Sequence, residues 1–307
     1  MKGYKGVIEN RRIPRIVHQT FARIEDLSPE ILEKNRQLEI LNPDYIFEYY
    51  DDVRVDSWIE ANCDDQLISV FRSINPNYGA AKADLFRYLL IYKTGGIYLD
   101  IKSTCIKPLD LIVNPLDEFI ISRWELDPLT NNRRFGRHME LQKLGIDEFQ
   151  QWFLISIPFN PIILSVIQEV TNRLSKSREK FRTSFGRLGV YRLTGPIVFS
   201  KVVASSKNLK EWREIDSFAE GFRYKLKADS GEIDYVNDSS KHYSKLFQPI
   251  VSNGSFSRMK IQTIFNLLIF QWFEKIHLFS YIIGKKIFRL QKSTAKNLND
   301  AQYLFLF

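Results

Sequence analysis

The feature that most constrains the fold is a predicted helix that ends in two glycines and passes directly into a short apolar strand. The segment "NYGAAKADLFRYLLIYKT", residues 77–94, is rich in alanine and leucine, which favour helix. Gly95 and Gly96 follow it as stop residues. The next segment, "IYLDI" (97–101), is apolar, β-branched and aromatic, as buried strands are. The sequence therefore predicts a helix packed against a core strand.

Other segments repeat this alternation of strands and helices. "RIVHQTF" (15–21), "YIFEYYD" (45–51) and "QQWFLISIP" (150–158) are strand candidates. A helix is expected from Ser28 as its N-cap to the Asn42–Pro43 pair, and another from Asn160. Strands that alternate with helices favour an α/β fold with a largely parallel sheet.

The end of the strand 97–101 carries charged residues that a core strand does not need. Because side chains alternate along a strand, Tyr98, Asp100 and Lys102 are expected on one face. A carboxylate there is expensive to bury without a partner. On the preceding helix, Asp84 and Arg87 are three residues apart and share a face. Ligands bind outside the carboxyl ends of strands in open α/β sheets, so these charged groups could meet around one small anionic ligand.

A simpler interpretation of the same residues stays open. Taken alone, Asp84 and Arg87 fit an ordinary ion pair on a helix surface, worth about 0.3–0.5 kcal/mol. Lys102 fits a residue at a strand end that reaches solvent. His18 is expected to be a buried, hydrogen-bonded strand residue, and Trp152 a core residue rather than a platform for an acceptor. His242 is expected at the surface, or else near the site.

Three segments together resemble a known family. "IPRIVHQTF", "NPDYIFEYYDD" and "AAKADLFRYLLIYKTGGIYLDIKSTCIKPLD" are similar to the glycosyltransferases with a sugar-binding D-x-D region, glycosyltransferase family 32. That family includes the yeast-type initiating α-1,6-mannosyltransferases and bacterial capsule and lipopolysaccharide glycosyltransferases, with the glucosylating clostridial toxins as distant relatives. The resemblance is strong from Ile13 to Asp110 and weaker at "TGPIVFSKVV". It implies a GT-A-type, Rossmann-like domain, a UDP- or GDP-hexose donor and retention of anomeric configuration.

The resemblance also implies roles for individual residues. Phe21 takes the place of the aromatic residue that stacks on the nucleobase. Asp84 and Arg87 match the A-D-x-x-R motif, whose members contact the donor sugar and the departing phosphate oxygen. The full set of substrate-binding positions implied in this way is Phe21, Asp84, Arg87, Tyr98, Thr194 and Gly195.

The sequence departs from the family at the second acidic position of D-x-D. Asp100 matches the first Asp, which contacts the donor and helps to hold Mn²⁺ or Mg²⁺, but Lys102 stands in place of the second. An ammonium group cannot be a metal ligand. In one interpretation Lys102 supplies positive charge directly to the diphosphate and partly replaces the metal. In the other, donor catalysis is lost or relies on a metal held by Asp100 and further residues. We favour the first, with Asp100 and Lys102 as catalytic residues.

Composition limits the partners of such a chain. The net charge is +8, which favours anionic partners such as phosphorylated small molecules, nucleic acid or an anionic membrane face. The Lys and Arg residues are dispersed and form no known nucleic-acid-binding module, so no nucleic acid is expected as a partner. Two cysteines outside any C-x-x-C pair and four scattered histidines argue against a zinc site or a disulfide framework.

The C-terminal part has a different character from the rest. Residues 251–307 are expected to form an amphipathic helical extension that touches an anionic membrane, whereas 1–250 are expected to form the GT-A domain. A helix packed on that domain is the alternative. Because the N-terminus has no apolar h-region, we expect no secretory signal and a cytoplasmic enzyme, peripheral on the inner membrane face.

Two functions of different class follow from these observations. The first is a retaining hexosyltransferase that acts on a glycan or lipid-linked acceptor in surface polysaccharide or glycoconjugate synthesis. The alternative is a non-catalytic sugar-nucleotide-binding protein derived from such an enzyme and disabled at Lys102.

Overall fold

The structure is a computed structural model of the 307-residue chain. It describes residues 11–124, 136–179, 184–206, 208, 212–224, 227–228, 231–232 and 246–251. These residues all fall within one compact unit, Met1–Ser252. The expected C-terminal extension and His242 lie outside the described residues, so the division into two domains stays a prediction.

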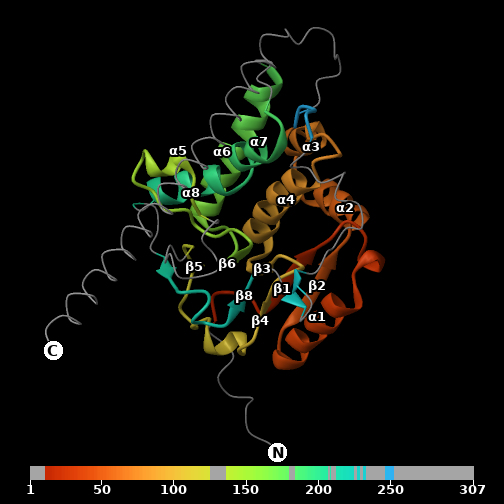
Figure 1. The fold of residues 1–307 in the computed structure, drawn as a ribbon, viewed down its shortest axis with the longest axis vertical. Coiled ribbons are helices and arrows are strands. Elements are labelled where there is room, and N and C mark those ends of the chain that lie inside the picture. Colours follow the sequence, from red (N-terminus) through yellow and green to blue (C-terminus); the bar gives the residue numbers. More distant parts are fainter. Residues whose placement is uncertain are drawn as a thin grey trace, which may run out of the picture. The chain divides into compact units, whose positions relative to one another are not determined.

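A six-stranded sheet in the order β2-β1-β3-β6-β5-β7 runs through this unit (Figure 1). Its strands are β1 (Ile16–Thr20), β2 (Ile46–Tyr50), β3 (Gly96–Leu99), β5 (Phe119–Ile121), β6 (Phe153–Ser156) and β7 (Arg213–Glu214). β1 pairs in parallel with β2 and β3, and β7 with β5, whereas β6 runs antiparallel to both of its neighbours. Two small sheets pair β4 (Thr104–Cys105) with β8 (Phe222–Arg223), and β9 (Lys227–Ala228) with β10 (Gly231–Glu232).

The reversed strand β6 determines which loops meet. Because β6 is antiparallel to β3, the residues that precede β6 lie at the same edge of the sheet as those that follow β3. The strand predicted over 150–158 is shorter in the structure, so its first residues belong to that edge. The mainly parallel sheet with its helices confirms the predicted α/β fold.

The helices pack around this sheet in the described part of the chain. They are α1 (Pro29–Leu41), α2 (Asp52–Asn62), α3 (Asp65–Ser73), α4 (Gly79–Thr94), α5 (Met139–Gln142), α6 (Pro161–Glu179), α7 (Gly186–Leu193) and α8 (Pro196–Ser205), with short 3-10 turns η1 (Ile24–Asp26) and η2 (Leu109–Leu111). Among the described residues, none of these helices is both long and apolar enough to cross a membrane.

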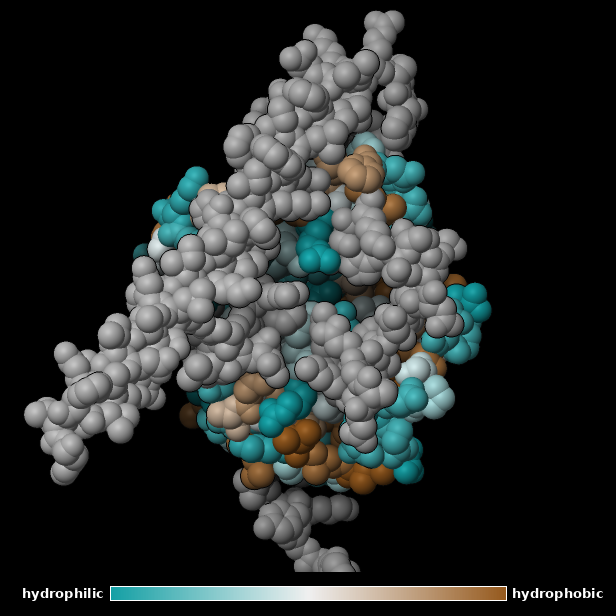
Figure 2. Space-filling model, viewed as in Figure 1, coloured by the Kyte–Doolittle hydropathy of each residue, from teal (hydrophilic) through white to brown (hydrophobic). Residues whose placement is uncertain are grey.

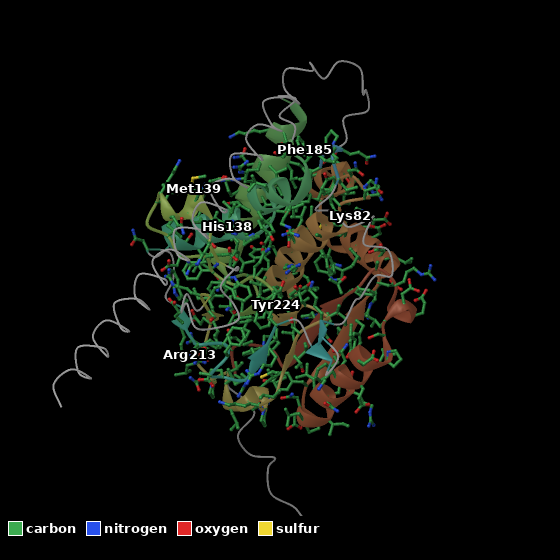
Figure 3. All side chains as sticks on the ribbon, viewed as in Figure 1. Lys82, His138, Met139, Phe185, Arg213 and Tyr224 are labelled. Carbon is green, nitrogen blue, oxygen red and sulfur yellow. The ribbon has the colours of Figure 1, made fainter. Side chains whose placement is uncertain are left out.

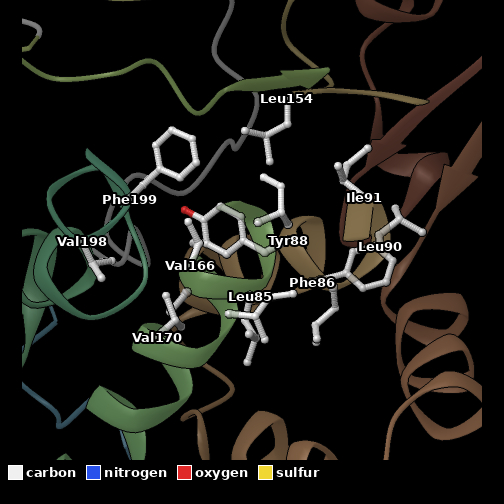
Figure 4. Packing of buried hydrophobic residues seen from close by; sticks show 14 of the residues in the cluster. Leu85, Phe86, Tyr88, Leu90, Ile91, Leu154, Val166, Val170, Val198 and Phe199 are labelled. Atoms are coloured by element: carbon white, nitrogen blue, oxygen red, sulfur yellow. The ribbon is translucent and has the colours of Figure 1, made fainter. Parts of the chain in front are cut away.

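Helix α4 lies in the larger of the apolar cores. Figure 4 shows its residues Leu85 and Tyr88 beside Val166 of α6 and Phe199 of α8. The rings of Tyr88 and Phe199 are stacked, with centroids 5.8 Å apart. A helix buried on most of its faces holds its polar side chains in fixed positions, and α4 contains Asp84 and Arg87 among its buried residues.

The junction between α4 and β3 requires its two glycines. Gly95 and Gly96 have φ angles of +65° and +92°, which L side chains rarely adopt. A Cβ on Gly95 would lie 2.6 Å from Cδ of Pro158, and one on Gly96 would lie 2.7 Å from the backbone oxygen of Ile16. The predicted helix stop is therefore confirmed, and the close packing there fixes where β3 begins.

The strand that follows is shorter than the sequence pattern predicts. β3 ends at Leu99, and Ser103 N donates to Asp100 O at 2.8 Å, so the chain turns at once. Alternation holds within the strand, because Tyr98 faces the α4 side and Leu99 the opposite core. The prediction that Lys102 shares a strand face with Tyr98 and Asp100 is wrong, since Lys102 lies in the turn.

Candidate active site

A buried arginine joins two carboxylates at the carboxyl edge of the sheet. Arg87 Nη2 lies 3.2 Å from Oδ1 of Asp84, one turn earlier on α4, and Nη1 lies 3.1 Å from Oδ1 of Asp100 after β3. The side chains of Asp84 and Arg87 are 6% and 7% exposed. An ordinary surface ion pair is therefore excluded. Figure 2 shows hydrophilic residues in a hollow near the middle of this face, in the region of α4 in Figure 1.

Further contacts fix the guanidinium in one orientation. Arg87 Nη1 donates to the backbone oxygen of Gln151 at 2.9 Å, and Cζ lies 4.7 Å from the centre of the Tyr98 ring. Burial disfavours the charged form, but Tyr98, Asp100 and Asp84 outweigh it and raise the pKa of Arg87. The guanidinium therefore stays charged and holds both carboxylates in place.

Asp84 is held on its other side by α7 and the segment before β6. Thr194 Oγ1 donates to Oδ2 of Asp84 at 2.9 Å, and Gln151 Nε2 donates to Oδ1 at 3.3 Å. Burial raises the pKa of Asp84 to about 6, although Arg87 and the Thr194 hydroxyl favour the ionised form. Asp84 thus changes its charge near the lower end of the physiological pH range.

Thr194 and Gly195 close this side of the site, where the resemblance places them. The backbone oxygen of Thr194 lies 3.0 Å from Tyr88 OH. A Cβ on Gly195 would lie 3.0 Å from Cα of Tyr191 and 3.4 Å from Oδ2 of Asp84. A glycine therefore leaves room for the chain to pass close to the Asp84 carboxylate.

Phe21 and Lys102 lie at the same edge but outside the contacts of Arg87. Phe21 directly follows β1 and packs, partly exposed, beside Ile31 and Ile101. Lys102 Nζ lies 5.9 Å from the ring centre of Tyr224. Asp100 pairs with Arg87, and the expected ion pair between Lys102 and Asp100 stays a prediction.

Two residues of the site were missed in the sequence. Tyr88 OH donates to Oε1 of Gln151, so both residues support the Asp84–Arg87 pair. Tyr88 could have been found, because it belongs to the quoted segment directly after Arg87. Gln151 gives no local signal, since only the reversal of β6 brings it to this edge.

The family resemblance implies a divalent metal, which would need several ligands from this site. Hard cations bind carboxylate oxygens, and several are needed. Among the described residues, no three His, Cys, Asp or Glu side chains gather in a way that could hold a metal ion. Oδ1 of Asp100 already accepts from Tyr98 OH at 3.3 Å and pairs with Arg87. These residues do not fit a metal centre by themselves, and the metal role of Asp100 stays a prediction.

Two other predictions concern residues beside the site. His18 is buried with Nε2 3.2 Å from the backbone oxygen of Gly95, and burial lowers its pKa to about 4. Trp152 is buried against Phe153, with ring centroids 4.8 Å apart. Both residues have the structural positions that the sequence predicts.

Comparison with known families agrees with this site. Residues 33–120 match the sequence model described as "Glycosyltransferase sugar-binding region containing DXD motif". This region contains Asp84, Arg87 and Asp100, with Lys102 in place of the second Asp. The match confirms, for this part of the chain, the family resemblance seen in its motifs.

Two curated relatives extend the similarity. The chain is 28% identical over 201 residues to the mannosyl phosphorylinositol ceramide synthase CSH1 of Saccharomyces cerevisiae, covering 65% of this chain and 44% of that protein. It is 24% identical over 207 residues to an initiation-specific α-1,6-mannosyltransferase of Schizosaccharomyces pombe, covering 64% and 49%. The chain thus spans about half the length of these relatives.

Solved structures show distant likenesses. The PaToxG glycosyltransferase gives a TM-score of 0.46 at 16% identity, covering 64% of this chain and 70% of that one. The catalytic domain of α-toxin from Clostridium novyi gives 0.39 at 10% identity, covering 78% and 79%.

Proposed function

We propose that this protein is a retaining glycosyltransferase that moves a hexose from a nucleotide sugar to a glycan or lipid-linked acceptor in surface polysaccharide or glycoconjugate synthesis. The observation that carries the proposal is the buried Arg87, which binds Asp84 and Asp100 at the carboxyl edge of the sheet. This is the edge at which open α/β sheets bind ligands. The names of the similar proteins support the reaction class and suggest mannose as the first hexose to test.

The chemistry follows from where the charges lie. Carboxylates such as Asp84 and Asp100 accept hydrogen bonds from sugar hydroxyls, and Arg87 keeps both oriented. The leaving group of a nucleotide sugar is an anionic diphosphate, and preorganised positive charge stabilises it as the glycosidic bond breaks. Because Arg87 is occupied by the two carboxylates, Lys102 in the turn after β3 is the residue we assign to the diphosphate.

The test is a panel of UDP- and GDP-hexoses offered to the full chain, with Mn²⁺ and then with EDTA. Turnover that survives EDTA supports Lys102 as the replacement for a metal. Turnover only with Mn²⁺ would show that Asp100 and further residues hold a metal, and would overturn that role. We expect Lys102→Ala to lower donor turnover at least 10-fold, with Lys93→Ala at the end of α4 as the matched surface control. Equal turnover of both variants would contradict the assignment.

The non-catalytic alternative rests on the same departure from the family motif. If the chain binds a nucleotide sugar but turns none over with any acceptor offered, Lys102 marks a disabled enzyme that kept its ligand. Isothermal titration with the same donor panel separates the two functions, because it measures binding without requiring chemistry.

We also propose that the enzyme works at the cytoplasmic side of a membrane, as a peripheral protein. The support is in the sequence of residues 251–307, where apolar and aromatic residues alternate with basic ones. A lipid acceptor appears in the name of one relative. Sedimentation with anionic liposomes, comparing the full chain with one cut near Val251, tests this idea. Equal recovery of both chains in the soluble fraction would remove it.

A further inference from the structure

A second polar cluster lies beside the candidate active site. Glu148 is a carboxylate with a side chain only 7% exposed, and Oε2 lies 2.6 Å from Nε2 of His138, which precedes α5. Trp124 Nε1 donates to Oε1 of Glu148 at 2.7 Å. Figure 3 labels His138 near Met139, where α5 begins. The cluster thus combines a buried acid, a histidine and an indole N–H.

The cluster is joined to the Asp84 site by two short connections. Glu148 is three residues before Gln151, which contacts both Arg87 and Asp84. Tyr191 is one helical turn before Thr194, and its ring centre lies 5.2 Å from that of His138. Three residues of chain span at most about 10 Å. The two connections therefore place His138 next to the donor site, on the side of α7.

A purely structural role explains this cluster poorly. Burying a carboxylate is costly, and apolar residues of the same volume are often at least as stabilising as a buried ion pair. Oε2 of Glu148 is buried, and its close contact with Nε2 of His138 lacks the geometry of a full hydrogen bond. Yet the side chain of His138 is 16% exposed, so this end of the cluster reaches the surface. A carboxylate beside one ring nitrogen of a histidine sets the protonation of the other, which is then available to a polar ligand.

The surroundings indicate the class of ligand. The ring of Tyr191 is set edge-on to the His138 ring, at an interplanar angle of 77°. Gly136, with φ +73°, lets the chain pass against Trp124, because a Cβ there would lie 2.7 Å from Cβ of Trp124. An aromatic ring next to a hydrogen-bonding imidazole suits a molecule with many hydroxyl groups and an apolar ring face.

We propose that His138, oriented by Glu148, belongs to the acceptor subsite and binds a hydroxyl group of a polyhydroxylated acceptor beside Tyr191. This inference rests on the proposed function, because it assigns the second substrate of the same reaction. His138 is a binding residue here, and Glu148 is a positioning residue that acts through it.

The test measures binding of two probes, methyl α-D-mannopyranoside and myo-inositol, to the full chain by saturation-transfer NMR. We expect the wild-type protein to bind at least one of them, and His138→Ala to weaken that binding at least 10-fold. Glu148→Gln should weaken it less, because the imidazole is retained. Tyr45→Phe, which removes a hydroxyl contact with Asp110 away from this cluster, is the matched control and should bind as wild type.

A second measurement separates binding from folding. Hydrolysis of the donor without any acceptor should change less than twofold in His138→Ala, because the donor residues are untouched. The proposal is overturned if the wild-type chain binds a nucleotide sugar but neither probe, if His138→Ala binds the probes as wild type does, or if its donor hydrolysis falls in parallel. If the wild-type chain bound no nucleotide sugar at all, the result would instead contradict the proposed function.

Discussion

Two charged clusters occupy opposite edges of the sheet. At the carboxyl edge one arginine, Arg87, binds two carboxylates. At the amino edge two arginines bind one carboxylate: Asp110 lies 2.7 Å from Nη2 of Arg15 and 2.9 Å from Nη1 of Arg11. Tyr45 OH donates to the same carboxylate at 2.8 Å. The residue types are the same, but the ratio of acid to base is reversed.

Burial makes the two clusters behave differently. Asp110 is 35% exposed; its partial burial opposes ionisation, but Arg15, Tyr45 and Arg11 outweigh it and lower its pKa. Asp84 is buried, and burial raises its pKa despite Arg87. In the cluster at the amino edge the charge of Asp110 is therefore neutralised by its two arginines, which suits a purely structural role. The cluster at the carboxyl edge has more acid than base, and Asp100 is partly exposed, which suits a binding site.

The largest difference should appear when each central arginine is removed. Arg87→Ala leaves the buried Asp84 and the partly buried Asp100 without their cation, which we expect to cost about 3–5 kcal/mol of unfolding free energy. Arg15→Ala leaves a partly exposed Asp110 that still contacts Arg11, so about 1 kcal/mol is expected. Urea denaturation followed by tryptophan fluorescence measures both.

Arg87→Lys is the control that separates charge from geometry. Lysine keeps the positive charge but loses the planar guanidinium that pairs with both carboxylates. The unfolding free energy of Arg87→Lys should therefore lie between those of wild type and Arg87→Ala. If Arg87→Ala and Arg15→Ala lost the same amount of unfolding free energy, burial would not distinguish the two clusters.

The second prediction concerns opposite pH dependences. Since the pKa of Asp84 rises from 3.8 to about 6, the folded chain holds a proton there that the unfolded chain has lost. This contribution to stability falls as the pH rises from about 4 to 6, on the order of 1–3 kcal/mol. The pKa of Asp110 is lowered, so its contribution is present above its ordinary pKa and is lost as the pH falls below it.

Unfolding free energies of Asp84→Asn and Asp110→Asn, each subtracted from wild type at pH values from well below 3.8 up to about 6, isolate the two contributions. The differences should slope in opposite directions, with the smaller one for the more exposed Asp110. If both differences changed with pH in the same direction, the two clusters would not have opposite pH dependences and the comparison would be refuted.

The smallest effects should come from the hydroxyl groups that support each acid. Thr194→Val removes the donor to buried Asp84 and is expected to cost about 1.5–3 kcal/mol, as hydrogen bonds to charged groups do. Tyr45→Phe removes a donor to partly exposed Asp110 and is expected to cost about 0.5–1 kcal/mol. Thermal unfolding of the two variants measures both losses of stability. The comparison requires the larger loss for Thr194→Val.

Local sequence pattern was sufficient for one half of the site. The helix 79–94, the glycine stop and the carboxylate of Asp100 all lie within 22 residues, so helical periodicity and the strand pattern place them. The end of β3 was misplaced because Ile101 continues the apolar alternation although the chain turns after Leu99. Propensity alone does not reveal a turn that is fixed by tertiary packing.

The other half of the site depends on distant segments. Gln151 reaches Asp84 because β6 runs antiparallel, and Trp124 meets Glu148 because Arg123 pairs with Phe149. No local rule predicts such pairings, since they depend on the topology of the sheet. Thr194 and Gly195 were located only because the family resemblance included their segment.

The hydrogen bond between Thr194 and Asp84 has a kinetic consequence. It joins residues 110 positions apart in the chain, and the contact of Arg87 with Gln151 joins residues 64 apart. Contacts of such long range form slowly, because the entropy of closing the loop is lost before the contact is gained. Helix α4 can form early from local interactions, but the site is complete only when the chain from 84 to 194 has docked. Recovery of nucleotide binding during refolding would therefore lag behind recovery of helical signal and report the last step of folding.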